Sequence, residues 1–544
     1  MTRIQRRLIQ ASIFLLLVAG MVVAQGALHR RRADPNQFTQ LIDEPSHFVT
    51  GLMIRDYVAR RLPGSPIRFA KEYYLHYPKV AFGSWPPLLH IFLGGWMLLL
   101  PPVRQSALLF MDVLVALLAL YSGWLARRSL PWLPAAGIAV AVWLSPVVQS
   151  LDQVVQADLQ YGLLSVVCMG SLALWMERPG ALRAVCFGLA LFGAAMTKNN
   201  ALFLAIAVPL AILLTRSFRL LRRAEFWLAA LPGALAVVVW QYFTLPFVQK
   251  NMKGVTEESV PGFVAFPYVW QLVTLVWIGL APFVLWGIYR RVWVPLRRGR
   301  VAPLDAALFA LLIGPVAFHS LLPHDVNQRY LLPALPALLI FAAAGVVDLF
   351  STFRIPYPAA LAAAALAVAI PSIATPVKPL PQAGFLAIAD HMAAHYPGSL
   401  YPSMLLESSF AGESQLIAEI AVRDHRPERW LLRGGKILRR RTGTLNNRQT
   451  AVVEEDPAEM LRYLKELPVS FLVVSDEGSA EIPDREYVAR MMKIEPELFH
   501  AELTVPYGPE CPSCTIRLYR VGASPGGGFH PERLPQNMPL WQGL

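Results

Sequence analysis

The stretch TQLIDEPSHFVTG (residues 39–51) places an acidic pair, Asp43 and Glu44, shortly after the first long apolar segment of the chain. Of the 544 residues, 55% are hydrophobic and only 16% are charged, with a mean hydropathy of +0.44. A soluble protein would carry roughly 25% charged residues. Several apolar runs are long enough to cross a hydrocarbon layer of about 30 Å as helices. The sequence therefore predicts an α-helical, polytopic membrane protein.

The first apolar segment, residues 8–28, follows three arginines and precedes a second basic run at residues 29–32. A cleaved signal peptide is the rival interpretation. Because the segment is longer than the roughly 7–15 residues of a signal core, we expect an uncleaved first span. The acidic pair then belongs to the first outer loop.

Eleven segments have the apolarity expected of membrane-spanning helices. They are residues 8–28, 104–126, 133–150, 159–176, 182–197, 200–215, 227–247, 267–288, 304–321, 330–350 and 358–374. A further apolar stretch, PPLLHIFLGGWMLLLPP (86–102), is short between its proline pairs. We predict an interfacial helix there. A cytoplasmic N-terminus and eleven spans place everything after about residue 375 outside.

The distribution of arginine supports this orientation. The short loops assigned to the cytoplasm contain Arg127, Arg128, Arg178, Arg183, Arg216, Arg219, Arg222, Arg223, Arg290, Arg291, Arg297, Arg298, Arg300 and Arg354. The short outer loops hold fewer cations, as the positive-inside rule predicts. Residues 30–32 oppose the rule, but they begin a long loop, and long loops translocate largely regardless of charge. The net charge of +13 needs no nucleic acid, since loop arginines facing anionic lipid account for much of it.

The chain divides into three parts by composition. Residues 1–375 form the predicted membrane domain, in which 29–103 is the first outer loop with interfacial helices. In residues 376–521, helical patterns occur at 389–396, 413–422, 457–467 and 485–492, and strand patterns occur at 470–475, 501–506 and 515–521. This mixture predicts a small extracytoplasmic α/β domain. Residues 522–544 are rich in Gly and Pro and are expected to be irregular. Cys511 and Cys514 form one CxxC pair, for which a local disulfide is favoured over a zinc site that would lack further ligands.

Ionisable side chains gather at one predicted membrane face, where such groups are functional candidates. They are Asp43, Glu44, Asp158, Lys198, His324 and Arg329, beside an aromatic, proline-rich loop that ends at Trp85. Each residue alone could be an ordinary solvated loop residue, and we assign Asp152 to that class. Tyr73, Tyr74 and Tyr77 fit either a pocket lining or an interfacial aromatic belt. Four loops remote in sequence nevertheless bring carboxylates and cations to a single face.

In their order and spacing, these motifs resemble the GT-C-fold membrane glycosyltransferases, in particular bacterial relatives of protein O-mannosyltransferases and of the lipid A aminoarabinose and lipopolysaccharide-core galacturonic acid transferases (glycosyltransferase family 39/83-like). The matching elements are the pair Asp43–Glu44 with a following short helix, HYPKVAFGSWPPLLHIFL (76–93), the later acid Asp158, the Thr197–Lys198 turn and RYLLPALPALL (329–339). The likeness covers about residues 5–375. At His47 the sequence departs from the Tyr that relatives often have nearby.

The resemblance implies transfer of a sugar from a polyprenyl-phosphate donor to an acceptor hydroxyl, with inversion at the anomeric carbon. The acceptor would be a lipid, a polysaccharide or a protein, at the outer face of the cytoplasmic (inner) membrane. Asp43 is the expected base, with Glu44 sharing that role or orienting substrate. Lys198, Arg329 and His324 would stabilise the leaving phosphate, and Asp158, Trp85, His47 and Tyr330 would contact substrate. Asp158 could also bind a divalent cation or hold a cation side chain; no metal ligand set is predicted, although a divalent cation stays open as a cofactor.

Other classes of protein fit the sequence less well. A secondary transporter usually shows repeated halves and charges near the membrane midplane, whereas this chain shows no repeat and its charges fall at one surface. A non-catalytic scaffold with the same fold is a second alternative. An O-antigen polymerase or ligase, which uses a pyrophosphate-linked donor, is the nearest enzymatic alternative.

Overall fold

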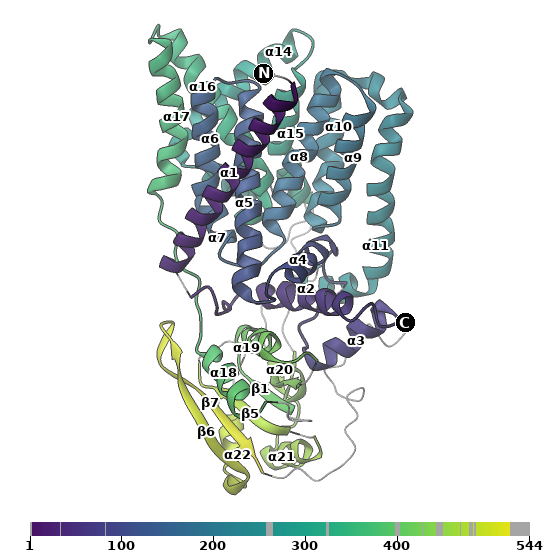
Figure 1. Ribbon diagram of the computed structural model, residues 1–544, viewed down its shortest axis with the longest axis vertical. Helices are drawn as coiled ribbons and strands as arrows, with labels where there is room; N and C mark the ends of the chain where they lie inside the picture. Colours follow the sequence, from purple (N-terminus) through teal and green to yellow (C-terminus); the bar gives the residue numbers. More distant parts are fainter. Residues whose placement is uncertain are drawn as a thin grey trace.

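The computed structural model describes residues 3–32, 34–81, 83–256, 265–321, 326–397, 403–427, 429–441, 450–467, 469–477, 482 and 486–522. A bundle of long helices occupies one end of the molecule and a small mixed sheet the other, with shorter helices between them (Figure 1). We call the end of the bundle that faces the sheet the sheet end.

Each of the eleven segments predicted to span the membrane is helical over most of its length, and the number of spans stays a prediction. The helices are α1 (Arg3–Arg32), α5 (Arg104–Arg127), α6 (Trp132–Leu144), α7 (Pro146–Leu151), α8 (Asp158–Glu177), α9 (Ala181–Ala195), η1 (Asn199–Phe203), α10 (Leu204–Thr215), η2 (Phe218–Arg222), α11 (Ala224–Thr256), α12 (Phe266–Thr274), η3 (Ile278–Leu280), α13 (Ala281–Ile288), η4 (Tyr289–Trp293), α14 (Val294–Arg297), α15 (Pro303–Leu321), η5 (Gln328–Ala334), α16 (Leu335–Thr352) and α17 (Tyr357–Ala374). Among the described residues, eight stretches are long and apolar enough to cross a membrane, or nine if the pair α12 and η3–α14, bent by 94°, counts as one. The α9 and η1–α10 segments are shorter apolar helices. The chain is therefore a multi-pass membrane protein.

The first long loop contributes α2 (Asp43–Ala59), α3 (Pro66–His76) and α4 (Leu88–Leu99). Helix α2 lies across the sheet end of the bundle and packs against α4 (Figure 1). Helix α4 is 12 residues long, which at 1.5 Å per residue is too short to cross a bilayer. The sequence predicted an interfacial helix within residues 86–102, and a short helix is found there. Its interfacial position stays a prediction.

The C-terminal sheet has the strand order β2-β1-β5-β7-β6. The strands are β1 (Ser403–Glu407), β2 (Trp430–Arg433), β5 (Val469–Ser475), β6 (Phe499–Gly508) and β7 (Cys511–Val521), and β3 (Arg439–Arg441) pairs separately with β4 (Thr450–Val452). Strand β1 is parallel to β2 and β5, and β7 is antiparallel to β5 and β6. Met404 and Leu406 face the apolar core that is continuous with the bundle, whereas Leu405 faces a second core. This alternation of faces follows from the two-residue period of a strand.

Helices cover both faces of this sheet. Around it lie α18 (Phe385–His395), α19 (Phe410–Arg423), α20 (Gly434–Ile437), α21 (Pro457–Glu466), α22 (Tyr487–Met492) and η6 (Pro496–Leu498). The predicted helical patterns at 389–396, 413–422, 457–467 and 485–492 overlap four of these helices. The predicted strands at 470–475, 501–506 and 515–521 overlap β5, β6 and β7. The proposed domain boundaries stay predictions, and the predicted irregular tail lies outside the described residues apart from Gly522.

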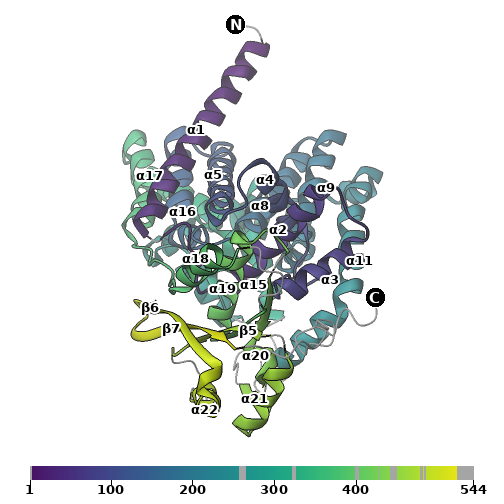
Figure 2. The same cartoon turned by 60° about the horizontal axis from the view of Figure 1, so that its bottom comes forward.

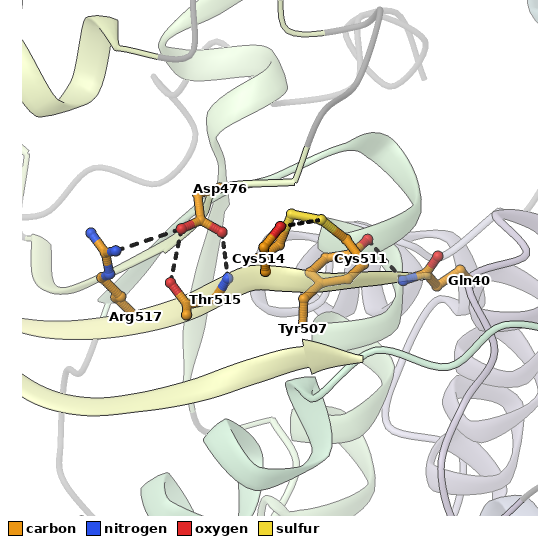
Figure 3. The surroundings of a disulfide bond; sticks show 8 residues. Gln40, Asp476, Tyr507, Cys511, Cys514, Thr515 and Arg517 are labelled. Carbon is orange, nitrogen blue, oxygen red and sulfur yellow. Dashed lines mark hydrogen bonds and ion pairs between the residues drawn. A yellow bond between two sulfur atoms is a disulfide. The ribbon is translucent and has the colours of Figure 1, made fainter. Parts of the chain in front are cut away.

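Cys511 and Cys514 form a disulfide within β7, which agrees with the favoured interpretation of the CxxC pair. Figure 3 shows this bridge beside two contacts of different kinds. Thr515 of β7 donates its hydroxyl to the carboxylate of Asp476, the residue after β5, at 2.9 Å. Gln40 of the first long loop donates to the Tyr507 hydroxyl at 2.8 Å. The second contact ties the sheet to the membrane part of the chain.

The C-terminal part docks on the first long loop through polar and aromatic contacts. Tyr77 donates its hydroxyl to Asp424 at 2.9 Å, and Lys436 donates to the Tyr74 hydroxyl at 2.8 Å. The His76 ring stacks on Trp430 with centroids 3.8 Å apart. Figures 1 and 2 both place α18 and α19 between the strands and the bundle. The tyrosines considered for an interfacial belt, Tyr73, Tyr74 and Tyr77, are instead buried in this junction.

Helices α13 and α16 approach each other closely through two glycines. A Cβ atom added at Gly287 would lie 2.1 Å from the Phe341 carbonyl oxygen, and one at Gly345 would lie 2.0 Å from the Phe283 carbonyl oxygen. Small residues let helix backbones pack at short distance in membranes. The two contacts are reciprocal, so both glycines set the spacing of the same helix pair.

We predict that Gly345→Ala lowers the thermal unfolding midpoint of the detergent-purified protein, because the helices must separate to admit the methyl group. Overpacking of this kind costs about 1–3 kcal/mol. Gly95→Ala in α4 is the matched control, since a Cβ there meets nothing within 4 Å. Equal midpoints for the two variants would contradict the close packing of α13 on α16.

Candidate active site

The predicted base, Asp43, begins helix α2. Its carboxylate is partly accessible, with a side-chain exposure of 38%, and its Oδ2 lies 3.5 Å from Nη1 of Arg329. A carboxylate in the first turn is stabilised by the helix dipole and by unpaired backbone N–H groups. An accessible carboxylate with one long ionic contact keeps an oxygen available to an approaching hydroxyl group.

The neighbouring acid, Glu44, has a different environment. It is buried, and its Oε1 accepts from Arg104 Nε at 2.8 Å. Its Oε2 accepts from the backbone N–H and the hydroxyl of Thr39, at 2.9 Å and 2.6 Å. Arg104 also donates to the Gln153 carbonyl oxygen at 2.7 Å. Both oxygens of Glu44 are therefore engaged, which favours a positioning role over the shared role of base that the sequence had allowed.

Lys198 follows α9 and forms a buried ion pair with Asp158, the first residue of α8. The Nζ–Oδ1 distance is 2.6 Å. Burial lowers the pKa of Lys198, and the nearby positive charge of Arg329 acts in the same direction, while Asp158 and Asp43 oppose it. The sequence left three roles open for Asp158: contact with substrate, binding of a divalent cation, or holding a cationic side chain. The observed contact is of the last kind, with Lys198.

Arg329 lies in the 3₁₀ segment η5 at the start of α16, where the Asn327 side chain accepts from its backbone N–H. Its guanidinium donates to Gln156 Oε1 at 3.2 Å and to the Tyr330 hydroxyl at 3.2 Å. Lys198 Nζ lies 5.0 Å from the centre of the Tyr330 ring. Tyr330 thus lies beside both predicted phosphate-binding cations.

His47, one helical turn after Asp43, packs against Trp85 with ring centroids 4.3 Å apart. Its Nδ1 lies 2.9 Å from Nε2 of His90. Burial, followed by the charges of Lys198 and Arg329, lowers the pKa of His47 to about 3. The imidazole is therefore neutral at physiological pH, and it packs against Trp85 and His90.

The structure brings together most of the residues predicted for the site. Asp43 contacts Arg329, and Arg329 and Lys198 both lie against Tyr330. The predicted site residue His324 lies outside the described residues. These side chains belong to segments far apart in sequence, at the sheet end of the bundle.

One cation at this site was not anticipated from the sequence. Lys79 is buried in the loop after α3, and burial lowers its pKa well below the usual value. Arg433 and Lys436 of the C-terminal part also lower it, whereas Glu413 and Asp43 raise it. The available signal was the position of this lysine in the aromatic loop just before the Pro86–Pro87 pair.

A second difference concerns Asp152, which the sequence analysis assigned to solvated loop residues. That interpretation is wrong, because Asp152 is fully buried and its Oδ2 lies 3.0 Å from Nε2 of His29. The position next to a span end suggested solvent exposure. The end of α1 covers it instead.

No protein-family model and no curated protein matches the chain. Solved structures do match it. ArnT from Cupriavidus metallidurans in the apo state aligns over 94% of this chain and 98% of its own, with 15% identity and a TM-score of 0.57. The same protein bound to undecaprenyl phosphate aligns over 95% and 100%, with 13% identity and a TM-score of 0.55. The Archaeoglobus fulgidus oligosaccharyltransferase tethered to an acceptor peptide aligns over 90% and 73%, with 12% identity and a TM-score of 0.52.

At such identities the likeness concerns the fold, and it covers nearly the whole chain. It extends beyond residue 375, where the resemblance in sequence motifs ended. The expected fold class is confirmed: the chain has the GT-C fold of membrane glycosyltransferases such as ArnT and the archaeal oligosaccharyltransferase.

Proposed function

We propose that the protein is an integral-membrane, inverting glycosyltransferase that moves a sugar from a polyprenyl phosphate to an acceptor hydroxyl group. The observation that carries the proposal is an accessible carboxylate, Asp43, beside Lys198 and Arg329 in a GT-C fold. One structure with the same fold is that of ArnT bound to undecaprenyl phosphate, which supports a donor of that class.

The sheet end is the proposed extracytoplasmic side of the cytoplasmic membrane. Arg104 at the start of α5 contacts Glu44 at the sheet end. Arg127 and Arg128, at the other end of α5, therefore lie at the opposite end of the bundle. This arrangement agrees with the positive-inside rule. The donor's hydrocarbon tail would lie in the bilayer while its sugar and phosphate reach the residues around Asp43.

Asp43 would take the proton of the acceptor hydroxyl as that oxygen attacks the anomeric carbon. A new glycosidic C–O bond forms, the bond between the anomeric carbon and the phosphate oxygen breaks, and the polyprenyl phosphate leaves with the electron pair. General-base assistance of this kind contributes typically 10²–10⁴-fold in rate. Attack from the face opposite the leaving phosphate inverts the anomeric configuration.

Lys198 and Arg329 would stabilise the charge that develops on the leaving phosphate. Asp158 holds Lys198 at 2.6 Å, and Gln156 accepts from Arg329, so both side chains are preorganised. His324 retains its predicted place among the phosphate contacts, and Trp85, His47 and Tyr330 are proposed to line the sugar site. The proposed acceptor is a lipid, a polysaccharide or a protein.

Asp43→Asn is expected to reduce sugar transfer by at least 100-fold, because the amide cannot take a proton. The substitution should leave the purified yield and thermal midpoint unchanged, since the contact of Asp43 with Arg329 is long, at 3.5 Å, and the carboxylate is partly accessible. Transfer is measured with purified protein and labelled polyprenyl-phosphate sugars. Asp390→Asn, which removes an exposed carboxylate paired with Arg423, is the control. Wild-type activity in Asp43→Asn would exclude Asp43 as the base and would favour a scaffold or another class of protein.

Glu44→Gln is expected to act through stability. Removing one charge of a buried ion pair costs roughly 3–5 kcal/mol, so Glu44→Gln and Arg104→Gln should each lower the thermal midpoint. The decrease in thermal midpoint of the double variant should be smaller than the sum of the decreases of the two single variants. An unchanged midpoint combined with lost transfer in Glu44→Gln would instead assign Glu44 to the reaction itself.

Lys198→Ala is expected to lower kcat about 100-fold, through the loss of a preorganised charge at the leaving group. Asp158→Asn should cause a smaller loss and should add little in the Lys198→Ala background, because it acts by holding Lys198. The control is Lys378→Ala at an exposed position. Fully additive losses would show that Asp158 contacts substrate independently.

A further inference from the structure

A buried polar cluster lies outside the candidate active site, where the end of α1 meets α5 and α7. His29, Asp112 and Asp152 come from three separate segments, and all three side chains are buried. His29 Nε2 lies 2.8 Å from Asp112 Oδ1 and 3.0 Å from Asp152 Oδ2. Two carboxylates therefore converge on a single ring nitrogen.

We propose that His29, Asp112 and Asp152 bind a divalent transition-metal ion. Their ligand atoms all lie within 4.8 Å of one another. Metal–nitrogen and metal–oxygen bonds of about 2.0–2.2 Å place the ligands of one ion roughly 3–4.4 Å apart. A small outward shift of the side chains therefore admits an ion between them.

The hydrogen-bonding pattern supports an ion over a simple ion-pair network. One imidazole N–H cannot donate two well-aligned hydrogen bonds to carboxylates from two different segments. The other oxygen of the Asp152 carboxylate, Oδ1, is buried and has no hydrogen-bond partner among the described residues. A buried, unpaired carboxylate oxygen is costly. A metal ion would satisfy both carboxylates and accept the lone pair of neutral His29.

The surrounding residues form the outer shell that a metal site needs. Gln25 donates its side-chain amide to Asp152 Oδ2, and its Oε1 accepts from Gln149 at 3.0 Å and from Trp143 at 2.9 Å. Arg32 donates to Gln149 Oε1 at 2.8 Å. The amides thereby fix the orientation of the Asp152 carboxylate. One imidazole with two carboxylates suits Zn²⁺ or Mn²⁺.

The proposed role of the ion is to clamp α1 to the bundle. Residues 9–20 of α1 are almost wholly exposed, whereas residues 21–29 are mostly half-buried or buried against the bundle, so the polar cluster lies where the helix is attached. The chain runs from Arg32 directly into the loop that carries Asp43 and Glu44. A clamp at His29 would therefore fix the start of that loop, without contacting the reacting groups.

The test measures metal content and stability, and neither depends on sugar transfer. The full-length, detergent-purified protein should contain about one zinc or manganese ion per chain, as measured by inductively coupled plasma mass spectrometry. Asp112→Asn and Asp152→Asn should hold none. Asp305→Asn, which removes a carboxylate paired with Arg291 elsewhere in the bundle, and Asp43→Asn should both retain the ion.

A second measurement uses the wild-type protein alone, so that misfolded variants do not decide the matter. EDTA should lower its thermal midpoint, and Zn²⁺ or Mn²⁺ should restore it. A wild-type protein that binds neither metal, with a midpoint unaffected by EDTA and by added metal, would overturn the proposal and leave a proton-bridged Asp–His–Asp network. Sugar transfer that persists after metal removal would leave the proposed function intact.

Discussion

The buried ion pair between Glu44 and Arg104 is the interaction on which the site depends. It joins the start of α2 to the start of α5, and Arg104 also donates to the Gln153 carbonyl oxygen just before α8. Two charges removed from water persist only when their hydrogen bonds are satisfied. Those of Glu44 are satisfied, which gives α2 a fixed position across the end of the bundle. Asp43, the adjacent residue, is thereby held at the edge of the site with its carboxylate accessible.

The cations opposite Asp43 are held by different means. Lys198 is paired with Asp158 at 2.6 Å, whereas Arg329 reaches Asp43 only at 3.5 Å and relies on Gln156 and Tyr330. A guanidinium that is fixed by neutral partners keeps its charge available to an anionic ligand. The C-terminal part brings Arg433, Lys436 and Glu413 near Lys79, and Arg433 is paired there with Glu413 at 2.8 Å. These features suit a reaction in which a phosphate leaves with negative charge.

Much of this arrangement could be predicted because the membrane limits the choices available to the chain. Long apolar runs had to be helices, and the arginine distribution indicated which loops share a side, so residues as distant as Asp43 and Arg329 could be assigned to one face. The partnership of Glu44 with Arg104 could not be predicted, since it depends on which helices are neighbours in space. Strands β1 and β2 were missed because SMLLE (403–407) and WLLR (430–433) are short apolar runs without the alternation typical of a half-exposed strand. Asp152 was misassigned because nothing in the sequence indicates that the end of α1 covers it.

The central claim is that segments remote in sequence form one site for a polyprenyl phosphate at the sheet end of the bundle. The most direct measurement is an experimental structure of the protein bound to undecaprenyl phosphate. The account predicts phosphate density within hydrogen-bond distance of Lys198 or Arg329 and on the same side of the bundle as Asp43, with the lipid tail running between the helices. Phosphate density at the opposite end of the bundle, or away from all three side chains, would contradict it.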